Sequence, residues 1–332
     1  MKQARILVAC ALAALLAPPA ALANDSAAVT GAGGLVLTRN DQIDMVSEDL
    51  YVSAERVRIR YVFRNRTPRP VRLTVAFPLP DFDLSVMDEG DRGHLSNFST
   101  RVDSRPVRMQ VERRVFARGV EHSALLRRLG IPVDTGADGY DPGPIGAALN
   151  RLPPAEQRRL EQLGLVEGHD DGGRRRYEAR WLVRETWHWE QVFPAGRDLV
   201  VEHSYAPGTG GTVSTGFGNP TIRNEDYMRE GIRLYCADAA FLAAAERMVR
   251  RPGVINVSEQ WIRYILTTGG NWRSPIGDFR LVVDKGRPEN LVSFCGEGVR
   301  RISPTRFEMR RRDWRPDRDL DILILVPSRE DD

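Results

Sequence analysis

Residues 57–77, VRIRYVFRNRTPRPVRLTVAF, contain the pattern that decides the fold. Apolar side chains at residues 57, 59, 61 and 63 alternate with Arg58, Arg60 and Arg64. Residues 71, 73, 75 and 77 are apolar with the same period. A period of two indicates strands that bury one face and expose the other. The proline-rich residues 65–70 separate the two runs, and proline cannot donate a hydrogen bond to a strand ladder. The stretch therefore predicts a hairpin of two half-buried strands on an antiparallel sheet.

The same alternation recurs along most of the chain. A second hairpin is predicted around residues 195–196, with the tryptophan-rich residues 181–189 on one strand and residues 199–205 on the return strand. Further apolar segments predict C-terminal strands over residues 261–266, 279–283, 291–295, 307–310 and 320–326. Short alternating runs bounded by turn residues are typical of strands, so the sequence predicts a mainly β fold.

Two parts of the chain favour helices instead. Residues 122–129 have helical composition, and residues 154–163 have a proline near their start and are followed by a glycine. Asp238 can cap a further short helix that runs to Val249. We therefore predict a helical insertion over residues 119–168 and one further short helix near the C-terminal strands.

The domain organisation predicted from these patterns is two antiparallel β-sandwich-like lobes. Residues 24–118 form an N-terminal β lobe, which continues over residues 169–220 after the helical insertion of residues 119–168. Residues 221–332 form a C-terminal β-rich lobe.

The first 23 residues differ in composition from the rest of the chain. A basic start is followed by an apolar run over residues 6–17 and by Ala-Leu-Ala at residues 21–23. A run of about twelve apolar residues is shorter than the roughly twenty that span a bilayer as a helix. Cys10 also matches a lipoprotein cleavage pattern, but it lies inside the apolar run rather than at its end. We therefore predict a secretory signal peptide cleaved after Ala23, and a periplasmic or secreted protein.

The charge balance argues against nucleic-acid binding, and the later apolar runs argue against a membrane-spanning segment. The chain has 48 lysines and arginines against 45 aspartates and glutamates. Nucleic-acid-binding proteins carry a strongly basic face, so no nucleic acid is expected. The most apolar run after the leader, residues 322–326, is five residues long and predicts a buried strand. No integral membrane segment is expected after cleavage.

Cleavage of the leader would leave two cysteines, Cys236 and Cys295. In an oxidising compartment an even number of cysteines indicates a disulfide. Two separate buried thiols are the alternative. We predict the disulfide between Cys236 and Cys295.

Motifs of known catalytic and cofactor sites are missing from the sequence. It contains no Gly-x-Ser-x-Gly, no phosphate-binding glycine-rich loop with Lys-Ser or Lys-Thr, no Cys-x-x-Cys and no His-Glu-x-x-His. The acidic residues 81–91 could hold a calcium ion through carboxylate oxygens, but their irregular spacing favours a solvated loop. We therefore predict no cofactor and no metal.

Two polar side chains, Glu185 and His203, interrupt the apolar faces of the second predicted hairpin. If the chain turns at residues 195–196, Trp187 lies opposite His203 and Glu185 is a diagonal neighbour. A carboxylate beside an imidazole among aromatic rings can act as an acid–base pair. Such a pair can also be a buried structural contact in which each group satisfies the other, and the sequence favours this second interpretation. Glu185 and His203 are the candidate catalytic residues.

Trp187, His188 and Trp189 are the candidate binding residues. Aromatic side chains combine a large apolar surface with a polar tip, which suits sugar rings as well as protein cores. A role of the tryptophans in the core is the favoured alternative.

Several longer motifs resemble one bacterial family. They are residues 30–35 (TGAGGL), 76–80 (AFPLP), 189–196 (WEQVFPAG), 235–238 (YCAD), 264–272 (YILTTGGNW) and 292–295 (VSFC). Together they resemble the exported bacterial proteins grouped as domain of unknown function 4424. The resemblance implies an envelope location and a β-rich fold, and it implies no catalytic residues.

Two functional hypotheses from different classes follow. The first is a non-enzymatic binding or assembly protein of the bacterial envelope, whose partner is an envelope protein or a glycan. The alternative is an extracytoplasmic hydrolase that uses Glu185 and His203. A third hypothesis is an accessory subunit whose partner carries the chemistry. An enzyme would lose its function at that pair of residues, whereas a binding protein would lose it through changes on surface loops.

Overall fold

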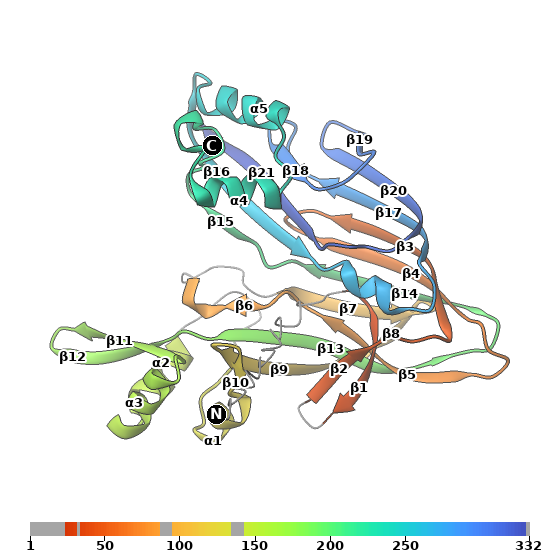
Figure 1. The fold of residues 1–332 in the computed structure, drawn as a ribbon, viewed down its shortest axis with the longest axis horizontal. Coiled ribbons are helices and arrows are strands. Elements are labelled where there is room, and N and C mark those ends of the chain that lie inside the picture. Colours follow the sequence, from red (N-terminus) through yellow and green to blue (C-terminus); the bar gives the residue numbers. More distant parts are fainter. Residues whose placement is uncertain (1–23, 32–33, 87–94, 134–142, 330–332) are drawn as a thin grey trace, which may run out of the picture.

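The computed structural model describes residues 24–31, 34–86, 95–133 and 143–329. Strands dominate this part of the chain, which confirms the predicted mainly β fold. They form sheets of eight, seven, four and two strands. In Figure 1 the four-stranded sheet with its helices lies at the top, the eight-stranded sheet in the middle and the seven-stranded sheet below it.

The eight-stranded sheet takes strands from both halves of the chain. In order across the sheet these are β19 (Arg300–Arg301), β20 (Arg306–Trp314), β17 (Ile276–Asp284), β3 (Ile43–Val52), β4 (Val57–Asn65), β14 (Asp198–Ala206), β7 (Ser96–Val102) and β8 (Arg105–Val107). β3 and β17 are parallel, whereas the other neighbours are antiparallel. The parallel pair joins the N-terminal and C-terminal parts of the chain in one sheet.

The seven-stranded sheet packs against one end of this central sheet. Its strands are β10 (Val120–Glu121), β9 (Gln110–Ala117), β13 (Leu182–Phe193), β5 (Val71–Pro78), β1 (Ser26–Gly31) and β2 (Gly34–Thr38), with β6 (Phe82–Asp83) paired to β13. The core between the two sheets contains the aromatic side chains Tyr61, Phe63, Phe77, Trp189 and Phe193. These residues occupy the apolar positions of the alternating sequence, because successive side chains of a strand point to opposite faces.

The four-stranded sheet packs against the other end of the central sheet. Its order is β15 (Gly210–Thr212), β16 (Val254–Tyr264), β21 (Leu320–Arg329) and β18 (Leu291–Phe294). Tyr264 and Ile322 from this sheet belong to the same apolar core as Phe63. One continuous core therefore runs under the whole central sheet.

Two helices cover the outer face of the four-stranded sheet, α4 (Asp226–Leu234) and α5 (Ala239–Val249) (Figure 1). Asp238 caps α5 as predicted, because its Oδ1 accepts a hydrogen bond of 2.7 Å from the Phe241 nitrogen. The predicted disulfide is also confirmed. It joins Cys236, just after α4, to Cys295, just after β18, with a Cα–Cα distance of 5.0 Å.

Residues 119–168 contain three helices, α1 (Ser123–Arg128), α2 (Gly143–Arg151) and α3 (Pro154–Gln162). They are followed by the two-stranded sheet of β11 (Val166–Asp171) and β12 (Arg174–Ala179). These elements bury a second apolar core of their own. In this core Leu126 and Leu160 lie with Trp181, just before β13, and Val183, within β13. Residues 134–142 lie outside the described residues.

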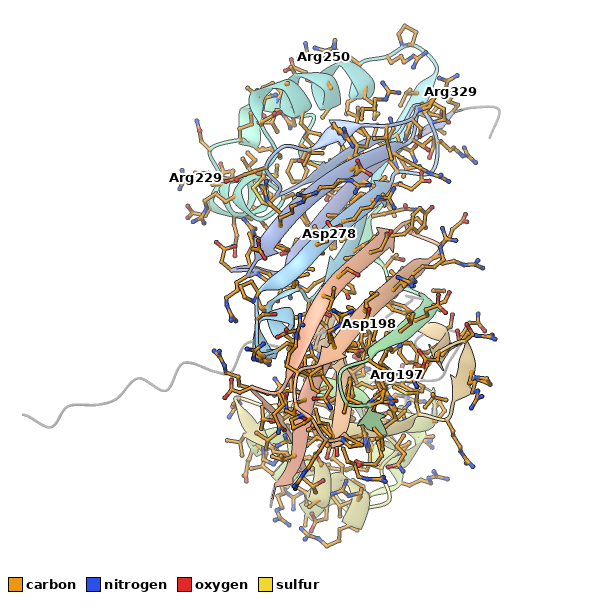
Figure 2. The ribbon with its side chains drawn as sticks, turned by 90° about the vertical axis from the view of Figure 1, so that its right-hand side faces the viewer. Arg197, Asp198, Arg229, Arg250, Asp278 and Arg329 are labelled. Atoms are coloured by element: carbon orange, nitrogen blue, oxygen red, sulfur yellow. A yellow bond between two sulfur atoms is a disulfide. The ribbon has the colours of Figure 1, made fainter. Side chains whose placement is uncertain are left out.

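Three short 3₁₀ helices complete the description: η1 (Leu84–Val86), η2 (Pro220–Ile222) and η3 (Thr267–Asn271). None of the helices in the described ranges is both long enough and apolar enough to cross a membrane. Charged side chains are spread along the surface, from Arg197 and Asp198 at the start of β14 to Arg250 and Arg329 near the top of the view (Figure 2).

Both predicted hairpins are wrong. β4 pairs with β3 and β14, whereas β5 pairs with β1 and β13. Likewise β13 pairs with β5, β6 and β9, whereas β14 pairs with β4 and β7. The chain crosses from one sheet to the other at residues 66–70 and again at residues 194–197. The prolines in these connections lack the donors that would continue a ladder, so each connection ends one sheet and enters the next.

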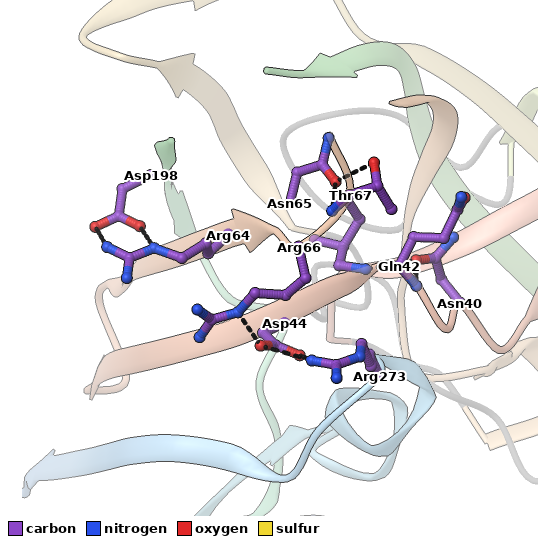
Figure 3. Close-up of polar contacts among 10 residues, drawn as sticks. Asn40, Gln42, Asp44, Arg64, Asn65, Arg66, Thr67, Asp198 and Arg273 are labelled. Carbon is purple, nitrogen blue, oxygen red and sulfur yellow. Dashed lines mark hydrogen bonds and ion pairs between the residues drawn. The ribbon is translucent and has the colours of Figure 1, made fainter. Parts of the chain in front are cut away.

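Asn65 holds the two crossings together, and Figure 3 shows its contact with Thr67. Its fully buried side chain donates to the carbonyl oxygens of Arg69 and Phe193, at 2.8 Å and 3.0 Å, and accepts from the nitrogen and hydroxyl of Thr67, each at 2.8 Å. The Asn65 carbonyl also accepts from the Gly196 nitrogen at 3.1 Å. One residue therefore joins the connection after β4 to the connection after β13.

Asp44, next to this corner, is held by two arginines (Figure 3). Arg66 Nε lies 2.5 Å from Asp44 Oδ2, and Arg273 Nη1 lies 3.1 Å from Asp44 Oδ1. Burial alone would raise the pKa of Asp44, but the hydrogen bonds from Arg66 and Arg273 outweigh it and lower that pKa. The ion pairs tie β3 to the segment that follows η3.

Candidate functional site

Glu185 and His203 lie on strands of different sheets, β13 and β14. Because the predicted hairpin is absent, the register that made them diagonal neighbours does not apply. Each side chain has its own polar partners. Glu185 Oε2 accepts from Arg113 Nε at 2.7 Å, and Glu185 Oε1 accepts from Trp187 Nε1 at 2.7 Å.

His203 pairs with Asp25, a residue that the sequence did not single out. His203 Nε2 lies 3.2 Å from both carboxylate oxygens of Asp25, and His203 Nδ1 lies 2.9 Å from Thr100 Oγ1. Both side chains of the Asp25–His203 pair are 0% exposed. Burial raises the pKa of Asp25, and the charge and hydrogen bond of His203 act in the opposite direction.

Aromatic rings surround the imidazole. Phe98 stacks on His203 at 5.5 Å between ring centroids, and Phe77, Trp189 and Tyr61 lie at 5.0 Å, 5.8 Å and 5.9 Å. The imidazole is therefore enclosed in the core between the two sheets.

A second buried carboxyl, Glu48 of β3, belongs to the same polar cluster. Glu48 Oε2 accepts from Asn24 Nδ2 at 3.0 Å, and Tyr264 donates to Glu48 Oε1 at 3.5 Å. The hydroxyls of Tyr61 and Tyr264 lie 2.9 Å apart. Burial, and after it the charge of Asp25, raise the pKa of Glu48 to about 8 against the weaker opposing hydrogen bonds.

Few features of the sequence predict this cluster. Glu48 occupies a strand position whose neighbours are also polar, and Asn24 and Asp25 follow directly on the predicted leader. Their partner Thr268 is 244 residues away from Asn24 in the sequence. The useful signal is the motif at residues 264–272, in which Thr268 hydrogen-bonds to Asn24 and Trp272 to Asp25.

The candidate binding residues lie on both faces of β13. Trp189 is buried in the main core, and Trp187 packs on its border against Phe98 at 4.8 Å between ring centroids. His188 lies between them on the opposite face of the strand and is half-buried. The two tryptophans therefore contribute to the core from this strand.

Glu185 lies where β13 passes from one apolar core to the other. Val183 belongs to the core of the helical region, and Trp187 borders the main core. Glu185 also lines a cavity of about 430 Å³ between the ends of the seven-stranded and four-stranded sheets. Trp261 and Arg263 line this cavity from the opposite side.

A different concavity, of about 510 Å³, lies on the outer face of the eight-stranded sheet. We call it the arginine groove, because its charged lining consists of Arg58, Arg60, Arg101, Arg280, Arg306, Asp49 and Glu202. Strand register places five of these side chains in one row. Each is opposite the next in the order Arg101, Glu202, Arg60, Asp49 and Arg280. The row shows that neighbouring strands present their charges on one face.

Four of the five guanidinium groups of the arginine groove contact neighbouring residues. Arg58 lies over the Tyr51 ring at 4.6 Å from its centroid, and Arg306 lies 5.8 Å from the same centroid. Arg101 donates to the Ser104 carbonyl through both Nε and Nη2. Arg280 binds Asp49 and Glu308, and Arg306 binds Asp284.

The described ranges contain no group of three or more histidine, cysteine, aspartate or glutamate side chains placed to hold a metal ion. In the acidic segment, Asp81 is engaged by Arg184 through two hydrogen bonds of 2.9 Å and 2.7 Å. Asp83 accepts from the Ser85 nitrogen. Residues 87–94, which carry the remaining acidic side chains of that segment, lie outside the described residues.

Comparison with solved structures gives distant similarities. A "putative nutrient binding protein" from Legionella pneumophila is 14% identical, with a TM-score of 0.45 over 92% of this chain and 70% of that chain. An M1 zinc metallopeptidase from Deinococcus radiodurans is 10% identical, with a TM-score of 0.25 over 86% of this chain and 43% of that one. No curated protein matches the chain.

The sequence of the chain matches one family over nearly its whole length. The profile of the domain of unknown function DUF4424 covers residues 23–323, which includes all four sheets of the fold. The match agrees with the motifs noted in the sequence. The chain therefore belongs to the DUF4424 family.

Proposed function

We propose that the protein is an exported, non-enzymatic binding protein of the bacterial envelope, and that it binds an anionic group in the arginine groove. The observation that carries this proposal is the excess of positive charge in the groove, where five arginines face two carboxylates. Guanidinium groups bind carboxylate and phosphate oxygens in a bidentate geometry. The ligand would therefore carry carboxylates or phosphates, as many envelope polymers do.

The arrangement of the arginines leaves charge available to a ligand. Tyr51 orders Arg58 through its ring, and a ring positions a cation without neutralising it. Arg101 is likewise ordered by a backbone carbonyl rather than by a carboxylate. Arg280 and Arg306, which do pair with carboxylates, form one wall of the same groove.

The burial of His203 favours binding over hydrolysis. General acid–base catalysis needs the catalytic group within hydrogen-bond reach of the substrate. Both His203 and its partner Asp25 are enclosed between two sheets and are fully buried. The arginine groove, in contrast, opens on the surface of the central sheet.

Binding of defined polyanions tests the proposal. The mature protein would be titrated at about 50 mM salt with polygalacturonate and with polyphosphate, and neutral dextran would serve as the uncharged polymer. We expect binding of at least one polyanion and no binding of dextran. Binding should weaken as salt rises, because the Debye length falls from about 10 Å at 0.1 M to about 3 Å at 1 M.

A pair of double variants locates the site. Arg58→Gln with Arg60→Gln removes two charges from the groove. Arg229→Gln with Arg250→Gln removes two exposed charges, one on α4 and one directly after α5 (Figure 2). We expect about a tenfold loss of affinity for the groove variant, which corresponds to about 1.4 kcal/mol, and little change for the helix variant. Equal losses in both variants, or no polyanion binding by the unaltered protein, would refute the proposed site.

A further inference from the structure

The residues that follow the predicted cleavage site are locked into the core. The nitrogen of Asn24 donates to Thr268 Oγ1 at 2.6 Å, and that hydroxyl donates back to the Asn24 carbonyl at 2.8 Å. The Asp25 carbonyl accepts from Trp272 Nε1 at 2.7 Å. Asn24, Asp25 and Ser26 are all fully buried. The chain is thus anchored from its first described residue.

The site for Asn24 is closely fitted. Gly269, in η3, has no side chain, and a Cβ at this position would lie 2.8 Å from Asn24 Nδ2. Such a contact would displace the Asn24 amide from Glu48, to which it donates at 3.0 Å. η3 therefore forms a pocket shaped for this one residue.

Acidic side chains outnumber basic ones in this pocket of the uncleaved chain. Two fully buried carboxyls, Asp25 and Glu48, lie in one polar cluster, and the charge of Asp25 acts on Glu48. In the described part of the chain, the side chains that hydrogen-bond to these two carboxyls are Asn24, Tyr264 and His203. His203 is the one basic side chain among these partners, against two acidic groups. Buried charges are stable only when they are paired and hydrogen-bonded.

We propose that cleavage after Ala23 creates an α-ammonium group on Asn24 which the folded protein buries as the counter-ion of Glu48. The nitrogen concerned is the one that donates to Thr268 Oγ1 in the structure, where it is a peptide nitrogen. Hydrolysis of the bond between Ala23 and Asn24 adds water and leaves a carboxylate on Ala23 and an amino group on Asn24. The amino group takes up a proton at neutral pH. The inference depends on this cleavage and not on anion binding in the arginine groove.

The new group would complete the cluster. With it, two basic groups share the cluster with two carboxyls, and the two further N–H groups of the ammonium can donate within the pocket. Asn24 Oδ1, which is buried and has no hydrogen-bond partner among the described residues, is one acceptor available at the same residue. Burial raises the pKa of Glu48 to about 8 in the uncleaved chain, and a buried ammonium nearby would lower it again. Leader removal would thus convert Glu48 from a neutral acid to a carboxylate.

Amine labelling provides a direct test, because the chain from Asn24 onward contains one lysine, Lys285. Lys285 is itself buried and donates to the carbonyl oxygens of Pro288 and Asn290. The mature protein, purified after its own leader cleavage, would be treated with an acetylating reagent and analysed by mass spectrometry. We expect the α-amine to be acetylated at least about tenfold more slowly in the native protein than in urea, since reaction needs a deprotonated and accessible amine.

A chain with Gly-Ser-Gly-Ser before Asn24 is the matched comparison, because its amine lies outside the pocket. We expect this amine to react rapidly in the native state. We also expect its unfolding equilibrium constant to be larger than that of the mature chain by a factor of about ten or more, as for other buried ion pairs that lose one partner. Glu48→Gln should reduce this difference, whereas Asp278→Asn, an exposed carboxylate on β17, should leave it unchanged.

Two results would overturn the inference. One is a native α-amine that reacts as fast in the mature chain as in the extended chain. The other is an N-terminal sequence that does not begin at Asn24, which would refute the predicted cleavage site while leaving polyanion binding untouched. If Glu48→Gln fails to fold, the labelling of the unaltered mature and extended chains still decides between the outcomes.

Discussion

Replacement of Asn65 by alanine should be among the most destabilising changes of a polar residue in this protein. The substitution removes four side-chain hydrogen bonds, two donated to the carbonyls of Arg69 and Phe193 and two accepted from Thr67. It keeps the backbone free to adopt the same conformation. The effect would therefore report on the contacts that join the two sheet crossings (Figure 3).

The magnitude follows from the burial of these groups. A protein hydrogen bond contributes about 0.5–1.5 kcal/mol net, and a buried group left without a partner costs about 1–3 kcal/mol. Phe193 O is buried, whereas the Arg69 carbonyl and Thr67 are nearer the surface and can bind water. We therefore expect Asn65→Ala to lower the free energy of unfolding by about 3 kcal/mol.

The chain offers a matched control at Asn219. Asn219 Oδ1 accepts from the nitrogen and hydroxyl of Thr221, at 3.0 Å and 2.7 Å, in the same local motif as Asn65 and Thr67. This second motif is exposed. Asn219→Ala should therefore lower the free energy of unfolding by about 1 kcal/mol, the usual effect of losing a helix cap.

Urea unfolding of both variants, followed by tryptophan fluorescence, measures the difference. Asn65→Asp supplies a further comparison, because it keeps the two acceptors but removes the donors to Arg69 and Phe193. We expect Asn65→Asp to be at least as destabilising as Asn65→Ala. If Asn65→Ala costs no more than Asn219→Ala, the buried side chain does not hold the crossings together and the reasoning is wrong.

Three further predictions concern the buried charges and the disulfide. His203→Ala should lower the free energy of unfolding by about 3–5 kcal/mol, because it leaves the Asp25 carboxyl buried without its partner. Thermal unfolding should show a larger loss of stability than for Glu185→Gln, whose partner Arg113 is partly exposed. A smaller loss for His203→Ala would contradict this. Hydrogen bonds from Arg300 and then Arg280 lower the pKa of Glu308 to about 2, so the stability from these contacts is present above about pH 4.5 and is lost as the pH falls towards 2. Urea midpoints across that range should show a flatter profile for Glu308→Gln, and an unchanged profile would count against the arginine contacts. Replacing Cys236 and Cys295 by alanine should lower the free energy of unfolding by about 4 kcal/mol, since the disulfide joins residues 59 positions apart. Calorimetry that finds no such loss would show that the disulfide does not restrain the unfolded chain.

The sequence predicted the class of fold and several elements well, because burial of one strand face leaves a local period of two. It also predicted the disulfide, which needed two cysteines in one compartment and no further geometry. It did not predict the neighbours of β4, β5, β13 and β14, because alternation shows which face of a strand is buried but not which strand lies beside it. Those pairings depend on contacts between distant segments.

The candidate site could likewise be predicted only in part. Glu185 and His203 were recognised as polar residues on apolar faces, and both are buried. Their partners, Arg113 and Asp25, were not recognised, because each comes from a segment far away in the sequence. Glu48 was missed for a further reason, since a polar residue in a partly polar strand carries no sign of burial until the opposing sheet is known.

The parallel pairing of β3 with β17 has a consequence for the timing of folding. The paired residues Asp49 and Arg280 are 231 positions apart. A ribosome must therefore synthesise most of the chain before the central sheet can be completed. Until then β3 has an open edge, and open edges are sites where other chains can add as extra strands. Sheets that depend on such distant contacts also form slowly. Newly made chains should therefore depend on chaperones that shield this edge until the C-terminal strands arrive.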